Sequence, residues 1–298
     1  PGLAEAGYLT NETVFSLTEL PQRIGVIGAG PIGCELAQAF ARFGSQVFLI
    51  EAGHGLMPNE DRDAAAIVEE RMVRDGVKRL CFGRELKLNK IDTGKRLTVD
   101  SHGQYYDITV DEILLGVGRT PNVQGLGLET AGVQYDRNGV MVNERLQTTN
   151  PRIYAAGDIC SKYKFTHAAD AMAQIVIQNA LFPHPFGLAY ASADSLVMPW
   201  CTYTEPEVAH VGMYEADARA KGLEVETYTY HLAEVDRAIL DGEDEGFARV
   251  HIQKGTDKIL GATIVAYHAG DMINEFSVLM KAGAGAKTVA RTIHPYPT

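Results

Sequence analysis

Three glycines, at positions 28, 30 and 33, separate a short apolar segment from a helical one. In a dinucleotide-binding turn of this spacing, Gly28 permits the tight turn, Gly30 lets a pyrophosphate approach the backbone, and Gly33 lets the helix pack on the strand. Pro31 suits the first helical position, because that position needs no N–H donor, and the free N–H groups beside it favour a phosphate. The spacing therefore predicts a dinucleotide site.

An acidic residue, Glu51, follows the next apolar segment, 23 residues after Gly28. At about this separation an acid accepts hydrogen bonds from the adenosine ribose hydroxyls. An acid here also repels a 2′-phosphate, and no arginine follows it immediately, so the sequence favours NAD(H) over NADP(H). The alternative is a solvated glutamate at the end of a strand.

Two strands and a helix must position these residues. The apolar segments 24–27 and 47–50 predict neighbouring strands. Between them, apolar residues at helical spacing predict one buried stripe, and Gly44 ends the helix. The residues of this stripe are Ile32, Leu36, Phe40 and Phe43.

The following residues extend the same fold. The pattern predicts a helix over 62–75, a strand near 77–81, a meander of three alternating segments after Gly83, and another apolar strand within 111–118. Together these elements predict a Rossmann-like α/β domain over residues 21–122.

The composition limits the possible partners. The chain has 298 residues, of which 46% are hydrophobic and 22% charged, and its net charge is −11. Since no segment concentrates lysine and arginine, we expect no nucleic-acid partner. No apolar run approaches the roughly 18 residues that span a bilayer, and no secretory signal is visible, so we expect no membrane partner and a cytoplasmic location. An acidic cluster among glycines predicts a solvated turn; it comprises Asp241, Glu243, Asp244 and Glu245.

The four cysteines are scattered along the chain, so they form neither a CxxC metal knuckle nor a short-spaced redox pair. Each is expected to be a small buried residue, and no metal site is predicted. They are Cys34, Cys81, Cys160 and Cys201.

Four motifs occur in a fixed order: the glycine turn, Gly-Val-Gly-Arg-Thr-Pro-Asn at 116–122, Thr-Thr-Asn-Pro-Arg-Ile-Tyr-Ala-Ala-Gly-Asp at 148–158, and Tyr-Thr-Glu-Pro-Glu-Val-Ala at 203–209. This order resembles the flavoprotein disulfide reductases, also called pyridine nucleotide-disulfide oxidoreductases, which include dihydrolipoamide dehydrogenase, glutathione reductase and mercuric reductase. The resemblance implies cofactor contacts for Gly118 and Arg119 in the second motif.

The resemblance also implies the domain order. A Rossmann-like NAD-binding domain is inserted in a partial FAD-binding domain, whose pieces are expected at 1–20 and 123–190. An α+β dimerisation domain with an antiparallel sheet, expected over 195–298 and truncated at its C-terminus, then forms a homodimer. Alternating segments near 246–253 and 259–265 fit that sheet. A following helical stripe faces the core or a partner; it comprises Ile273, Phe276 and Met280.

The third motif implies a flavin contact. A predicted strand over 153–156 meets Gly157, which has no side chain to block close approach, and Asp158, whose carboxylate could accept hydrogen bonds from ribityl hydroxyls. The alternative is an aspartate that caps a turn. Beyond it, Thr166 is predicted to cap a helix over 167–182.

The beginning of the helix over 167–182 has an electrostatic role in the prediction. The N–H groups of His167 and Ala168 lie at its positive end, where they would stabilise negative charge on the pyrimidine edge of the flavin. The His167 side chain itself is typical of a capping or surface histidine.

Glu35 lies at the edge of the predicted stripe, beside Ile32, Leu36 and Ala39. An unpaired carboxylate there is costly, so a partner is expected. The resemblance implies a catalytic pairing with a lysine beside the flavin, in a segment that would precede Pro1. The alternative is a glutamate bent toward solvent.

The last residues, His-Pro-Tyr-Pro-Thr at 294–298, depart from the usual His-Pro-Thr of the family, whose histidine relays a proton to a thiol of the partner subunit. They are similar to the Pro-Tyr-x-Thr of mercuric reductases. Tyr296, a poor base at neutral pH, could donate a hydrogen bond or approach a thiolate-bound soft metal. We expect it in the active site of the dimer, with His294 as a substitute for the relay; the alternative is a structural aromatic.

The resemblance implies an oxidoreductase that passes a hydride from NADH through FAD to a redox cysteine pair. A small-molecule disulfide or a thiolate-bound metal such as Hg(II) is the expected acceptor. In the family, the flavin-ADP turn and the CxxxxC pair precede the region that this sequence covers, so we expect a fragment cut at both ends, with weak or absent FAD binding and no activity alone. The alternatives are a dihydrolipoamide dehydrogenase-like enzyme and a non-catalytic nucleotide-binding and dimerising module.

Overall fold

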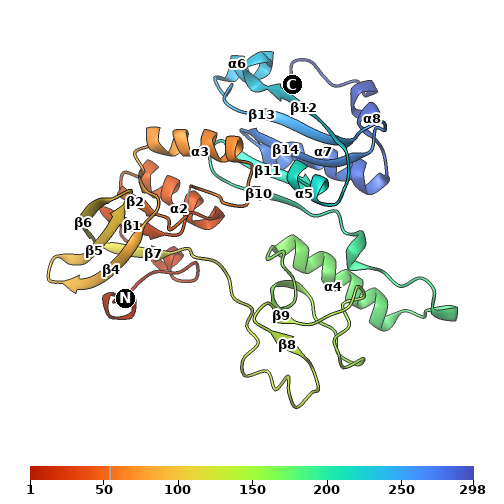
Figure 1. The fold of residues 1–298 in the computed structure, drawn as a ribbon, viewed down its shortest axis with the longest axis horizontal. Coiled ribbons are helices and arrows are strands. Elements are labelled where there is room, and N and C mark those ends of the chain that lie inside the picture. Colours follow the sequence, from red (N-terminus) through yellow and green to blue (C-terminus); the bar gives the residue numbers. More distant parts are fainter. Residues whose placement is uncertain (54) are drawn as a thin grey trace. The chain divides into compact units, whose positions relative to one another are not determined.

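The computed structural model describes residues 1–53 and 55–298, and it divides into two units (Figure 1). The first unit combines Pro1–Gly118 with Pro199–Thr298, and the second comprises Arg119–Met198. Each unit is described by itself. Within the described residues, no helix is both long and apolar enough to cross a membrane.

A four-stranded parallel sheet forms the centre of the predicted Rossmann-like domain, in the order β3-β2-β1-β7. Helix α2 connects β1 to β2, and α3 connects β2 to β3, as parallel strands require. The bounds are β1 Arg23–Ile27, α2 Pro31–Arg42, β2 Gln46–Ile50, α3 Arg62–Arg74, β3 Lys78–Leu80 and β7 Glu112–Leu115. The predicted α/β fold is confirmed.

An antiparallel meander connects β3 to β7, in the order β4-β5-β6. Its bounds are β4 Arg84–Ile91, β5 Gly94–Ser101 and β6 Gln104–Val110. The short helix α1, Leu3–Ala6, contacts β4, and Leu9 forms a parallel bridge with Leu114. A short 3-10 turn, η1, follows at Val14–Ser16.

The buried face of α2 differs from the predicted stripe. Phe43 is 70% exposed, because the helix ends at Arg42 and Phe43 stands at the C-cap. Only Phe40 of the four predicted residues is buried. Gly33, Cys34 and Ala37 are buried instead, since a Cβ at Gly33 would already meet the Gly28 carbonyl oxygen; the other buried residues are Gln38 and Phe40.

A five-stranded antiparallel sheet follows in the same unit, in the order β10-β11-β14-β13-β12. Its bounds are β10 Pro199–Thr202, β11 Glu207–Gly212, β12 Val225–His231, β13 Phe247–Gln253 and β14 Ile259–Ala266. Every residue of the central strand β14 is buried. The predicted antiparallel sheet is confirmed.

Short helices connect and cover these strands (Figure 1). Their bounds are α5 Glu215–Ala220, η5 Leu232–Glu234, α6 Asp236–Asp241, α7 Ala269–Ala282 and α8 Ala286–Arg291. Helix α7 contacts β10, β11 and β14. Of its predicted stripe, Ile273 is buried, while Phe276 and Met280 are partly exposed.

The second unit has little regular structure apart from α4, Thr166–Leu181. The other elements are β8 Tyr135–Asp136, β9 Gly139–Val140, and the 3-10 turns η2 Gly157–Ile159, η3 Pro185–Gly187 and η4 Ala193–Ser195. Its buried cluster is small and comprises Leu146, Met172 and Ile175.

Two sequence predictions about the second unit are wrong. No strand forms over 153–156, where Tyr154 makes only an isolated bridge to Gln147. Phe165, rather than Thr166, stands at the N-cap of α4, so the helix begins one residue earlier than predicted. The single bridge leaves this segment without the repeated pairing that extends a strand.

Candidate functional site

The glycine turn between β1 and α2 is closely packed at two of its three glycines. Gly28 has φ 101°, and a Cβ there would lie 2.5 Å from the carbonyl oxygen of Gly116. A Cβ at Gly33 would lie 1.9 Å from the carbonyl oxygen of Gly28. A Cβ at Gly30 would meet no heavy atom within 4 Å. The outer glycines therefore allow protein to pack on protein, whereas Gly30 leaves the backbone open to a ligand.

Helix α2 begins at this turn without a side-chain cap. Gly30 stands at the N-cap and Pro31 at the first helical position. Because neither residue supplies a capping oxygen, no side chain of the cap occupies the first free N–H groups of the helix. This arrangement suits a phosphate.

Glu51 lies beside the turn, directly after β2. One of its carboxylate oxygens, Oε2, accepts a hydrogen bond from the Ala29 N–H at 2.8 Å, and Oε1 accepts one from the Gly53 N–H at 2.8 Å. These two bonds hold the carboxylate at the turn. Since each carboxylate oxygen has two lone pairs, Glu51 can still accept hydrogen bonds from a ribose.

Three neighbouring strands end at this site. Gly28 follows β1, Glu51 follows β2 and Gly116 follows β7. The chain order reverses at β1, which has β2 on one side and β7 on the other. Ligands of open α/β sheets bind in the crevice at such a point, beyond the carboxyl ends of the strands.

Glu35, on α2, has a hydrogen-bond partner within the unit. Its Oε1 accepts a hydrogen bond from the backbone N–H of Tyr203, which follows β10, at 2.8 Å. The side chain is half-buried. The expected partner therefore includes a backbone group of the second sheet; the pairing with a lysine stays a prediction.

A buried acid that the sequence reasoning missed lies just before α3. Glu60 is 7% exposed; its Oε1 accepts a hydrogen bond from Trp200 Nε1 at 2.9 Å, and its Oε2 accepts one from the Tyr214 hydroxyl. Burial raises the pKa of Glu60 and of Tyr214. Trp200 is the only tryptophan of the sequence, but its separation of 140 residues from Glu60 gave no signal of the contact.

The predicted flavin-contact residues lie in the second unit, apart from Gly118, which ends the first. Gly157 has φ 80°, and a Cβ there would lie 2.9 Å from the Cβ of Ala169, so the turn requires glycine. Asp158 is exposed, with Oδ2 3.7 Å from Arg119 Nη1. The carboxylate is therefore open to a ligand.

The first turn of α4 presents one buried and one exposed residue. Ala168 is fully buried, and His167 is exposed and stacks on the ring of Phe165, with centroids 5.2 Å apart. The His167 side chain thus makes a ring contact at the surface.

The C-terminal candidates pair with acids of the same chain. His294 Nε2 lies 3.0 Å from Glu275 Oε1, and the Tyr296 hydroxyl donates to Asp236 Oδ2 at 2.7 Å. Tyr296 is 82% exposed. Hydrogen bonding to Glu275 raises the pKa of His294, and hydrogen bonding to Asp236 raises that of Tyr296.

All four cysteines are free. Burial raises the pKa of Cys34 to about 12 and that of Cys160 to about 11, and it also raises the pKa of Cys81 and Cys201. Among the residues that the structure describes, no three His, Cys, Asp or Glu side chains are grouped to hold a metal ion. Cys34 and Cys81 are buried as predicted, whereas Cys160 and Cys201 are half-buried.

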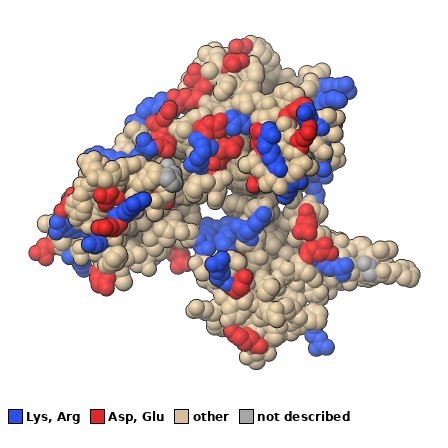
Figure 2. Space-filling model, in the orientation of Figure 1, with Lys and Arg blue, Asp and Glu red and all other residues tan. Residues whose placement is uncertain are grey.

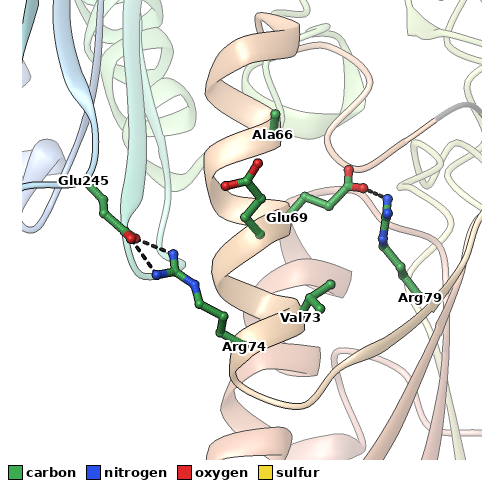
Figure 3. Close-up of a pocket in the computed structure, with 7 residues that line it drawn as sticks. Ala66, Glu69, Val73, Arg74, Arg79 and Glu245 are labelled. Atoms are coloured by element: carbon green, nitrogen blue, oxygen red, sulfur yellow. Dashed lines mark hydrogen bonds and ion pairs between the residues drawn. The ribbon is translucent and has the colours of Figure 1, made fainter.

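A groove with a volume of about 580 Å³ runs along α3 and extends to Arg79 and Glu245 (Figure 3). Two ion pairs line it: Arg74 with Glu245, and Arg79 with Glu69. The acidic cluster is thus not wholly a solvated turn, because Glu245 binds Arg74, and Asp241 also pairs with Arg237. On the face in Figure 2, acidic and basic side chains are interspersed over the first unit.

Known protein families account for nearly the whole chain. Residues 1–174 match the pyridine nucleotide-disulphide oxidoreductase family, and residues 198–298 match the dimerisation domain of that family. Among solved structures, the HOCl-induced flavoprotein disulfide reductase RclA from Escherichia coli is 28% identical with a TM-score of 0.87, over 100% of this chain and 67% of that one.

Curated relatives carry two names. A mercuric reductase of Staphylococcus aureus is 34% identical over 299 residues, which are 100% of this chain and 54% of that protein. A dihydrolipoyl dehydrogenase of Bacillus subtilis is 30% identical over 304 residues, 100% of this chain and 63% of that protein. The chain thus spans between about half and two thirds of the length of these relatives. On these matches and this geometry, the chain belongs to the pyridine nucleotide-disulphide oxidoreductase family.

Proposed function

We propose that this chain forms the NADH-binding and dimer-forming part of an oxidoreductase that passes a hydride from NADH, through FAD, to a redox cysteine pair outside this sequence. The family uses FAD and a nicotinamide nucleotide. The single observation that carries the proposal is the Glu51 carboxylate, which two backbone N–H groups hold beside the open glycine Gly30.

The preference for NADH follows from the charge at this position. A dinucleotide whose pyrophosphate lies over Gly30 and the first turn of α2 would bring its adenosine ribose to Glu51. The ribose hydroxyls of NADH would donate hydrogen bonds to this carboxylate. A 2′-phosphate would instead place negative charge against it, so NADPH is disfavoured.

The second unit supplies the proposed flavin contacts. Its exposed Asp158 carboxylate fits ribityl hydroxyls, and Gly157 keeps the turn beside it free of a side chain. The N–H groups at the start of α4, at His167 and Ala168, would stabilise negative charge. FAD, when bound, accepts the hydride and passes two electrons on. Arg119, 3.7 Å from Asp158, would help to orient that carboxylate.

The acceptor is proposed from the last residues. Tyr296 within Pro-Tyr-Pro-Thr at 295–298, with His294 two residues before it, favours a thiolate-bound metal such as Hg(II), and the mercuric reductase relative of Staphylococcus aureus supports this assignment. The dihydrolipoyl dehydrogenase relative supports a small disulfide as the second candidate. The dimerisation domain supports a homodimer, and a cytoplasmic location belongs to the same proposal.

Nucleotide binding tests the proposal directly. The emission of the single tryptophan, Trp200, is titrated with NADH and with NADPH, for the unaltered chain and for Glu51→Ala. We expect NADH to bind about tenfold more tightly than NADPH, and Glu51→Ala to remove that difference. Equal affinities in the unaltered chain would contradict the role of Glu51.

Flavin content tests the expected dependence on the rest of the enzyme. We expect the purified chain to lack the visible absorbance of FAD and to reduce no dye with NADH. Stoichiometric flavin with turnover would show that the chain acts alone. The non-catalytic module is the remaining candidate, and turnover by a longer protein that contains this chain would exclude it.

A further inference from the structure

The buried acid Glu60 connects the nucleotide fold to the antiparallel sheet. Its two oxygens accept hydrogen bonds from Trp200 on β10, at 2.9 Å, and from Tyr214, which follows β11. Both donors are aromatic side chains with few rotatable bonds. Because both carboxylate oxygens are engaged, the side chain is held in one position.

The two aromatic donors are themselves fixed by a buried histidine. The ring of Tyr214 stacks on His210 at 3.7 Å, and the ring of Trp200 lies 4.6 Å from it. His210 Nδ1 is 2.8 Å from Thr263 Oγ1 in β14. Burial lowers the pKa of His210 to about 3, so the ring is neutral at physiological pH. The sheet thus presents Glu60 with an ordered pair of donors.

The segment that carries Glu60 reaches the glycine turn. The Met57 N–H donates a hydrogen bond to the carbonyl oxygen of Ala29, at 2.8 Å, and Ala29 lies between Gly28 and Gly30. The Arg62 guanidinium donates to the carbonyl oxygens of Leu56, Met57 and Glu60, which holds the segment as one body. Leu56 and Met57 are each 1% exposed, in the same apolar cluster as Ala29.

We propose that Glu60 is a positioning residue for the dinucleotide site. Trp200 and Tyr214 hold Glu60, Arg62 ties Glu60 to Met57, and Met57 sets the position of the Ala29 peptide. Ala29 in turn donates its N–H to Glu51. This inference rests on the proposed binding of NADH at the turn.

The choice of a carboxylate supports a role beyond filling space. A buried carboxylate is costly without donors, and a buried apolar side chain of similar volume would avoid that cost. What a carboxylate adds here is a fixed, two-point connection between segments that lie 140 and 154 residues apart in sequence. Such a connection sets geometry, which is what a preformed binding turn needs.

The test compares three substitutions by titrating the Trp200 emission with NADH. We expect Glu60→Ala to weaken NADH binding about tenfold and to shift the emission before any nucleotide is added. Glu60→Gln should keep an NADH affinity and a Trp200 emission close to those of the unaltered chain. Its amide oxygen can accept a hydrogen bond from the indole while its NH₂ donates one to the Tyr214 oxygen. The matched control is Glu70→Ala, which removes an exposed glutamate of α3 and should change neither readout.

The outcomes separate the two proposals. If the unaltered chain binds NADH and Glu60→Ala binds it equally well, the positioning role is overturned while the proposed function stands. If the unaltered chain does not bind NADH, both are overturned. Should Glu60→Ala fail to fold, Tyr214→Phe removes one of the two hydrogen bonds without changing the ring; about threefold weaker binding supports the role, and unchanged affinity overturns it.

Discussion

The glycine turn and the segment around Asp158 are the two proposed cofactor contacts, and they are built differently. At the turn, backbone packs on backbone so closely that a Cβ at Gly33 would lie 1.9 Å from a carbonyl oxygen. Its acid, Glu51, accepts hydrogen bonds from two backbone N–H groups. Asp158 instead lies exposed on a short 3-10 turn, with Arg119 3.7 Å away.

This difference shows that a packed sheet can fix the geometry of a site by itself, whereas a lightly packed unit does not. The turn, the helix and the acid of the proposed nucleotide site lie on the consecutive elements β1, α2 and β2. The packing of α2 on the parallel sheet therefore positions all three. The second unit has a small apolar cluster and strands of two residues. The proposed flavin contact Asp158 therefore lies on the surface of a lightly packed unit, whereas the proposed nucleotide contacts lie on a closely packed turn.

Gly33→Ala should have the largest effect, because it disrupts the close packing that distinguishes the turn from the Asp158 segment. The added Cβ would meet the Gly28 carbonyl oxygen, which belongs to the backbone and cannot rotate away. We expect the free energy of unfolding to fall by about 3 kcal/mol, together with the loss of measurable NADH binding. Thermal unfolding and the Trp200 titration measure the two effects. A stable variant with full affinity would mean that the turn is not closely packed.

Gly30→Ala separates binding from folding at the same turn. A Cβ at Gly30 would meet no protein atom within 4 Å, and the backbone there has φ −72°, which alanine adopts readily. We expect unchanged unfolding but about tenfold weaker NADH binding, because the methyl group would occupy the place of the pyrophosphate. Unchanged affinity would show that the nucleotide does not lie over Gly30.

The pH dependence of stability compares the buried acid with its amide. Burial raises the pKa of Glu60 above its ordinary value of 4.5, so between 4.5 and the folded-state pKa the folded chain binds more protons than the unfolded chain. The stability of the unaltered chain relative to Glu60→Gln should therefore rise as the pH falls through this window. It should level off below pH 4.5.

Denaturant unfolding of both proteins across this pH range measures the difference. Taking the difference removes the contributions of the other acids, and Glu70→Gln is the control for a lost exposed carboxylate. A difference that stays flat, or that falls with falling pH, would contradict the burial of an ionisable Glu60.

Asp158→Ala should have the smallest effect on this chain. The carboxylate is exposed and its ion pair with Arg119 is long, so the free energy of unfolding should change by less than about 0.5 kcal/mol. The affinity for NADH should also stay the same. A measurable loss of NADH binding would show that the two regions do not act independently.

Local patterns predicted the fold around the proposed nucleotide site well. Gly28, Gly33 and Glu51 depend on residues close in sequence, and the turn, helix and strand that carry them form as the spacing indicates. The predicted buried stripe of α2 was less accurate. Close packing at Gly33 buries the small residues Cys34 and Ala37, and Phe43 is exposed because the helix ends before it.

Contacts between distant segments could not be predicted in this way. Glu60 looked like one of many acids at the start of a helix, and nothing in its neighbourhood indicates an indole 140 residues later. The same holds for Glu245, whose place among glycines suggested a solvated turn until Arg74 of α3 was found beside it. Such pairs depend on how the two sheets pack, which periodicity does not encode.

The four cysteines of this chain are expected to be unreactive at neutral pH. With every thiol pKa raised by burial, only a tiny fraction of each is thiolate at neutral pH, and thiolate is the form that attacks disulfides and captures soft metals. We therefore expect the four thiols to react slowly with alkylating reagents at neutral pH.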